Sequence, residues 1–66
     1  MRVLINGDER ELSGSVTITG LVESLELSSQ RVAIELNRNV IRKKDWPETS
    51  VNDGDQIEVV HFVGGG

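Results

Sequence analysis

The stretch of this chain whose residue types could do chemistry is its end, where a β-prone run leads into Gly64, Gly65 and Gly66. Glycine has no Cβ, so a glycine backbone can pass through a channel that excludes any side chain. Three residues of about 3.3–3.6 Å each would carry a terminal carboxylate about 10 Å beyond Val63. A glycine end taken alone is more often without function, so the rest of the chain must decide whether this end has one.

The group offered at this end is a carboxylate. An α-carboxyl group has a reference pKa of about 3.3–3.7, so it is ionised at neutral pH and inert toward nucleophiles. It must first be given a leaving group. Attack of the carboxylate on the α-phosphate of ATP would provide one by forming an acyl-adenylate at Gly66.

The remaining residues offer few other kinds of chemistry. The chain has no cysteine, which excludes disulfides, thiolate zinc sites, Fe–S clusters and thiol catalysis. A single histidine, His61, with scattered carboxylates argues against a dedicated metal site. No nucleophile–base pair is visible, and Gly64–Gly66 cannot form a phosphate loop because no helix follows them. We therefore expect a protein without catalytic residues, bound cofactor or metal.

Charge and composition limit the kinds of molecule that this chain is expected to bind. The 7 basic and 11 acidic residues give a formal charge of −4, and there is one Phe and one Trp, so nucleic acid is a poor candidate ligand. No signal peptide or long apolar run is present, which predicts a soluble, cytoplasmic protein that does not bind membranes. With 66 residues we expect one small domain over residues 1–63, followed by a flexible glycine tail over 64–66.

The N-terminal third predicts a hairpin and a helix. Residues 1–5 form an apolar strand, and Asn6-Gly7 is a strong signal for a hairpin turn, with a return strand expected over residues 10–13. Thr17 stands where a helix N-cap belongs, and the helix should end near residues 25–27. The helix has one apolar face with helical spacing, formed by Ile18, Leu21, Val22 and Leu25.

The remainder predicts three further strands. Residues 31–36 form a strand with Val32 and Ile34 facing the core, and residues 40–41 form a short edge strand after a turn. Trp46 lies in a short helical turn that we expect to end before Pro47, with the indole as a lid on the edge of the core. The last strand, over residues 56–63, follows a tight turn at Gly54 and turns Ile57 and Val59 inward.

This order of elements predicts an α+β fold. One helix must bury its apolar face against one side of a mixed sheet of four to five strands, because no other layer is available. The first and last strands would lie parallel at the centre and leave the glycine tail free at one end. This arrangement is the β-grasp, or ubiquitin-like, roll.

Val60 and Phe62 alternate onto the face opposite Ile57 and Val59, next to the tail. One interpretation is a second small core layer beneath the segment 40–46. The other is an exposed apolar patch on which partner proteins dock.

The chain resembles the ThiS family of sulfur carriers along its whole length. The resemblance is carried by Val3-x-Ile5-Asn6-Gly7, Thr17-Ile18-x-x-Leu21-Val22-x-x-Leu25, Val32-Ala33-Ile34-Glu35-x-Asn37, Val40-Ile41-Arg42, Asp45-Trp46, Asp53-Gly54-Asp55-x-Ile57-Glu58 and the ending His61-Phe62-Val63-Gly64-Gly65-Gly66. Most of these pieces are common, whereas their combination with the chain length and the glycine ending is specific. Gly20 departs from the family, which usually has a polar, better helix former there.

The resemblance implies that the Gly66 carboxylate is adenylated with ATP by an E1-like, ThiF-type enzyme and then converted to a thiocarboxylate. A cysteine persulfide would supply the sulfur, and a ThiG-type thiazole synthase would accept it for the thiazole of thiamine. Two alternatives share the adenylation step: a MoaD-like carrier for molybdopterin synthesis, and a ubiquitin-like modifier that forms isopeptide bonds with lysines. A plain β-grasp binding module, in which the glycines are incidental, is a further alternative.

Overall fold

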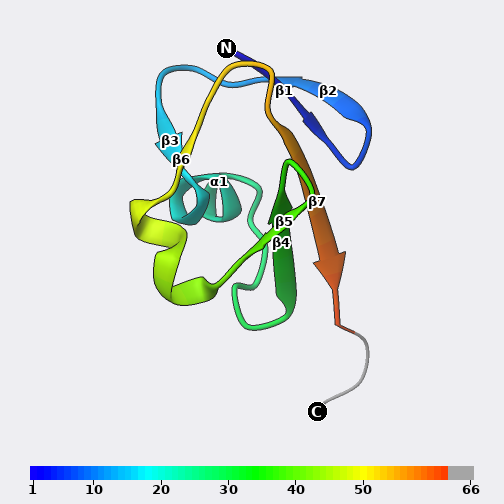
Figure 1. Cartoon of the computed structure of the whole chain (residues 1–66), viewed down its shortest axis with the longest axis vertical. Coiled ribbons are helices and arrows are strands. Elements are labelled where there is room, and N and C mark those ends of the chain that lie inside the picture. The colour runs from blue at the N-terminus through cyan, green and yellow to red at the C-terminus, as the bar shows by residue number, and fades with distance from the viewer. Residues whose placement is uncertain (63–66) are drawn as a thin grey trace.

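The computed structural model describes residues 1–62, which form a five-stranded mixed sheet with one α-helix on one face (Figure 1). The strand order is β2-β1-β7-β4-β5. These strands are β1 (Arg2–Ile5), β2 (Asp8–Glu11), β4 (Val32–Leu36), β5 (Asn39–Ile41) and β7 (Gln56–His61). The predicted domain boundary at Val63 and the tail over 64–66 lie outside the described residues.

The first and last strands lie side by side at the centre of the sheet, as predicted. β1 pairs with β7 in parallel, with Leu4 opposite Gln56 and Ile5 opposite Ile57. β7 also pairs with β4 in antiparallel orientation along five residue pairs, and β2 and β5 form the edges. Because β7 has a neighbour on both sides, its direction is fixed by the rest of the sheet.

The helix α1 (Ile18–Ser24) begins at the predicted N-cap and covers one face of the sheet. The Gly20 N–H donates to Thr17 Oγ1 at 3.1 Å, which satisfies one of the helix's free amides. Ile18 and Leu21 are fully buried, and so is Ile34 on the facing strand. The predicted inward positions are confirmed, since the core consists of Val3, Ile5, Ile18, Leu21, Val22, Val32, Ile34, Trp46, Val51, Ile57 and Val59.

The β1–β2 hairpin has the predicted turn, but its return strand begins earlier than expected. Asn6 and Gly7 both have positive φ, 51° and 85°, as a two-residue hairpin loop of type I′ requires. Pairing therefore resumes at once, with Ile5 opposite Asp8, and β2 covers residues 8–11 rather than 10–13. Leu12 follows the strand and still packs against the core.

Two features near Trp46 differ from the expectation. A 3₁₀ helix, η1 (Lys43–Glu48), continues through Pro47 instead of ending before it. The indole is 3% exposed, so Trp46 is a core residue rather than a lid. Its burial is tolerated because the Nε1–H donates to the Ile41 carbonyl at 3.0 Å.

A second, two-stranded sheet ties η1 and the helix together. It pairs β3 (Val16–Thr17) with β6 (Ser50–Val51), and the Ile18 N–H donates to the Thr49 carbonyl at 2.9 Å. In the described part of the chain no helix is long and apolar enough to cross a membrane.

Candidate functional site

The strand that leads to the glycines is held firmly up to Phe62. The Val59 N–H donates to Asn6 Oδ1 at 2.7 Å, which joins the β1–β2 turn to the middle of β7. The Phe62 N–H donates to the Arg31 carbonyl at 2.8 Å, one residue beyond the last strand residue. The chain thus leaves the sheet from a fixed point. The predicted site residues Gly64, Gly65 and Gly66 lie outside the described residues.

Val60 and Phe62 lie on the face of the sheet opposite the helix and are exposed. Their exposed fractions are 47% and 53%, and Val40 at the edge of the same sheet is 70% exposed. The interpretation of a second core layer beneath residues 40–46 is therefore wrong, because that segment does not cover these side chains. Exposed apolar side chains that lie on one face of a sheet are suited to contact a partner.

His61 follows the inward phase of β7 but lies where the strand passes the end of the core. Its pair in the register is Val32, and its side chain is exposed. It lines a small hollow with Arg10 and Leu25 at the end of the helix. Within residues 1–62 no group of three or more acidic or histidine side chains is placed to hold a metal ion.

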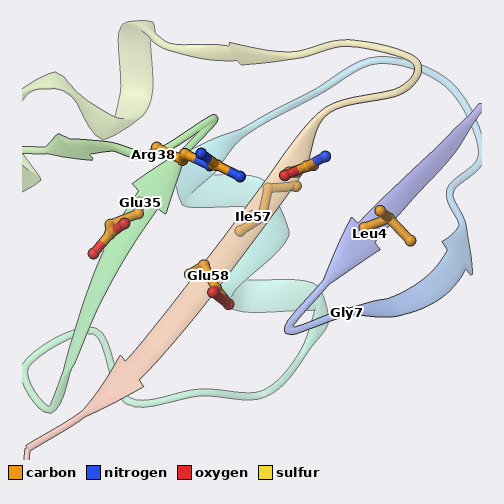
Figure 2. A pocket seen from close by; sticks show the side chains of 7 residues that line it. Leu4, Gly7, Glu35, Arg38, Ile57 and Glu58 are labelled. Carbon is orange, nitrogen blue, oxygen red and sulfur yellow. The ribbon is translucent and has the colours of Figure 1, made fainter.

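The face of the sheet that the helix does not cover also carries a shallow hollow (Figure 2). Glu35 on β4 and Glu58 on β7 stand at one end of it, directly opposite each other in the register. Leu4 on β1 forms its apolar side, and Arg38 reaches in from the turn between β4 and β5. The hollow thus brings together residues of three strands, β1, β4 and β7, and of the turn between β4 and β5.

Sequence reasoning did not select these residues. Glu35 and Glu58 occupy outward positions of two strands, where a glutamate is ordinarily a solvated side chain. Their proximity follows from the register between β4 and β7, which alternation in either strand alone does not determine. The sequence could have indicated that Glu35 and Glu58 are neighbours only if the pairing of β4 with β7 had been known.

Comparison with known proteins gives a consistent result. The family model described as "ThiS family" matches residues 3–66. The chain is 42% identical over 66 residues to a thiazole synthase of Paramagnetospirillum magneticum, covering all of this chain and 20% of that protein. It is 44% identical over 50 residues to the sulfur carrier protein ThiS of Bacillus subtilis, covering 76% of each. The chain thus spans about a fifth of the thiazole synthase it matches and most of the smaller carrier.

A solved structure agrees with the fold. The crystal structure of the thiamine biosynthesis protein ThiS from Geobacter metallireducens superposes with a TM-score of 0.88 at 33% identity, covering 100% of both chains. The predicted α+β, β-grasp architecture is therefore confirmed. With a family match that runs from the first strand through the glycines, this chain belongs to the ThiS family of ubiquitin-like β-grasp proteins.

Proposed function

We propose that this protein is a sulfur carrier for thiamine biosynthesis whose reactive group is the Gly66 carboxylate. The observation that carries the proposal is the family match over residues 3–66, which includes the glycine ending as well as the domain. A carrier of this kind takes part in catalysis as a protein cosubstrate. It contributes no acid, base or metal, and its role is to present the acyl end to its partners.

The chemistry requires activation first. The carboxylate oxygen of Gly66 attacks the α-phosphate of ATP, pyrophosphate leaves, and an acyl-adenylate forms on a ThiF-like enzyme. The terminal sulfur of a cysteine persulfide then attacks the acyl carbon, and AMP leaves. A second thiol then attacks the cysteine sulfur of the resulting acyl disulfide. This thiol supplies the two electrons, a new disulfide with the cysteine forms, and a thiocarboxylate remains on Gly66. ATP is therefore a substrate of the partner enzyme and not a bound cofactor of the carrier.

A ThiG-like thiazole synthase is the proposed acceptor of the sulfur. Two thiazole synthases match this chain over its full 66 residues, with 42% and 35% identity, so a carrier-like region occurs within proteins of that name. A carrier and an acceptor that are joined in one chain must meet repeatedly, and linkage raises their effective concentration. This supports a direct encounter between the present chain and such a synthase.

Val60 and Phe62 are the proposed docking residues. Both are exposed, both lie on the open face, and Phe62 is the last described residue before the end of the chain. A partner that grips residues 63–66 would lie beside these side chains. Burying exposed apolar side chains beside the gripped segment would contribute affinity without interfering with the carboxylate.

Reconstitution tests the proposal. The chain is incubated with the ThiF-like enzyme of the same genome, ATP, a persulfide donor and a thiol, and pyrophosphate release is measured together with the mass of the carrier. We expect stoichiometric pyrophosphate release and a thiocarboxylate product, and neither with a variant that lacks Gly65 and Gly66. Equal activity of the shortened variant would contradict the proposal and favour a plain binding module.

The acceptor distinguishes the related functions. Transfer of sulfur to a ThiG-like synthase but not to a molybdopterin synthase partner supports the thiazole assignment. The reverse result would assign the chain to molybdopterin synthesis. Conjugates joined through Gly66 to lysines of other proteins would instead indicate a ubiquitin-like modifier.

A further inference from the structure

Two glutamates are cross-strand neighbours on the open side of the sheet, where both line the same hollow (Figure 2). Glu35 and Glu58 are directly opposite in the antiparallel register of β4 and β7. Side chains at such positions have Cβ atoms about 4.5–5.5 Å apart, and like charges there destabilise the sheet. In the described part of the chain, the ion pairs within 4 Å are Arg2 with Glu9 and Arg2 with Glu11, so neither Glu35 nor Glu58 forms an ion pair there.

The space beside the pair has the dimensions of one side chain. The hollow encloses about 210 Å³, below the range of about 300–1,000 Å³ typical of small-molecule sites. The half-buried Leu4 lines it, so an alkyl chain would find an apolar wall before reaching the carboxylates (Figure 2). Lysine and arginine have this amphipathic form, with an apolar stem and a cationic head.

We propose that this hollow receives a lysine or arginine side chain of the adenylating enzyme, whose cationic head binds between Glu35 and Glu58. The inference rests on the proposed carrier function, because it names the partner of that activity. An enzyme that holds ATP and attracts a terminal carboxylate must maintain positive potential around its active site. The carrier, with a net charge of −4 and two glutamates without an ion pair in the described residues of its open face, is complementary to such a surface.

The distances allow one enzyme to hold the pair and the chain end together. Glu58 is eight residues before Gly66, which corresponds to at most about 26–29 Å of extended chain. A standard interface of about 800 Å² on each partner is about 30 Å across. The proposed docking residues Val60 and Phe62 lie between the two points. Glu35 and Glu58 therefore extend the same interface toward the centre of the sheet.

Arg38 is the cation of this chain that lines the same hollow. Arg38 lies in the turn between β4 and β5 with a φ of 72°. It forms no ion pair within 4 Å among the described residues. Its presence limits the occupant to a single basic side chain, since a second one would meet the guanidinium. It also gives a matched test, because removal of Arg38 should strengthen the enzyme's contact and not weaken it.

The experiment compares two double variants with the same change in net charge. E35Q/E58Q removes the opposed pair, whereas E23Q/E48Q removes exposed carboxylates of the helix and of η1, on the other side of the sheet. Pyrophosphate release by the ThiF-like enzyme is measured against carrier concentration at about 25 mM and about 200 mM NaCl, because charge attraction at a surface is screened by salt. The melting temperature of each variant is measured alongside.

We expect E35Q/E58Q to raise KM for the carrier by about threefold to tenfold at low salt with kcat unchanged, since charges near an interface act chiefly on association. Its KM should also depend less on salt than that of the unmodified chain. Its melting temperature should be equal or higher, because the repulsion across the strands is gone. E23Q/E48Q should change KM by less than about twofold, and R38Q should lower it.

Three results would overturn the inference. The first is an unchanged KM for E35Q/E58Q, and the second is an equal rise for both double variants, which would indicate net charge alone. The third is that E35Q/E58Q slows only the transfer of sulfur from preformed thiocarboxylate to the thiazole synthase. In that case the two glutamates would contact the synthase and not the adenylating enzyme. If the unmodified chain releases no pyrophosphate at all, the carrier function fails and this inference fails with it. Normal turnover of the unmodified chain with any of the three results rejects the inference alone.

Discussion

The substitution Phe62→Ala separates a docking residue from a structural one. Phe62 is 53% exposed, so about half of its side chain is removed from water in the free protein. Full burial of a phenylalanine is worth about 1.5–3 kcal/mol, so truncation should lower the free energy of unfolding by about 1 kcal/mol. The hydrogen bond from the Phe62 N–H to the Arg31 carbonyl remains possible in the variant, because it is made by the backbone.

A loss of this size should lower the melting temperature by about 4–8 °C in a domain of this length. For comparison, Ile34→Ala in the fully buried core should cost about 2–5 kcal/mol, at least twice the loss expected for Phe62→Ala. Thermal unfolding is followed by circular dichroism. The two variants should therefore differ clearly in stability, and the Phe62 variant should remain folded for kinetic measurements.

The same Phe62 variant should be poorly adenylated. If the ring inserts into the ThiF-like enzyme, KM for the carrier should rise by about tenfold or more, because truncation of a docking aromatic commonly costs above about 1.4 kcal/mol. Leu27→Ala is the matched control, since Leu27 is a half-buried apolar residue that follows α1, on the side of the sheet opposite Phe62. A large loss of thermal stability together with normal adenylation would refute the docking role of Phe62.

Three further substitutions test how the fold is held together. Gly20→Ala should stabilise the protein by about 0.5–1 kcal/mol, because a Cβ there would lie 3.6 Å from Thr17 Oγ1, an ordinary contact, and the melting temperature should rise. Asn6→Ala should cost about 1–3 kcal/mol in urea unfolding, because it removes the acceptor of the Val59 N–H and places alanine at a positive φ, and an unchanged midpoint would contradict both effects. Trp46→Phe should cost a similar amount, about 1–3 kcal/mol, because the Ile41 carbonyl loses its donor, whereas a smaller loss would show that packing alone holds the ring.

Much of the fold follows from local sequence signals. Helical spacing with a Thr17 cap identifies α1, and strand alternation identifies the inward residues Ile34, Ile57 and Val59, all of which are buried. The turn at Asn6-Gly7 is predictable because few residues tolerate positive φ at both loop positions. These signals suffice because the described residues form a single α-helix packed on a single core.

The features that sequence reasoning missed depend on tertiary contacts. β3 and β6 have two residues each, too few to show a period. Burial of Trp46 depends on a hydrogen bond to a carbonyl five residues earlier, in a segment that is otherwise charged. The exposure of Val60 and Phe62 was one of two open interpretations, because alternation determines the face of a residue but not what covers that face.

The mass of the carrier isolated from cells tests the central claim most directly. We expect a fraction about 16 Da heavier than the unmodified chain, in which sulfur replaces one oxygen. Oxidation of Met1 adds nearly the same mass, so tandem fragmentation must locate the increment. The increment should lie on Gly66 and disappear in cells that lack the adenylating enzyme. An increment confined to Met1, or a carrier that stays unmodified when adenylating enzyme, ATP and sulfur donor are all present, would contradict the account.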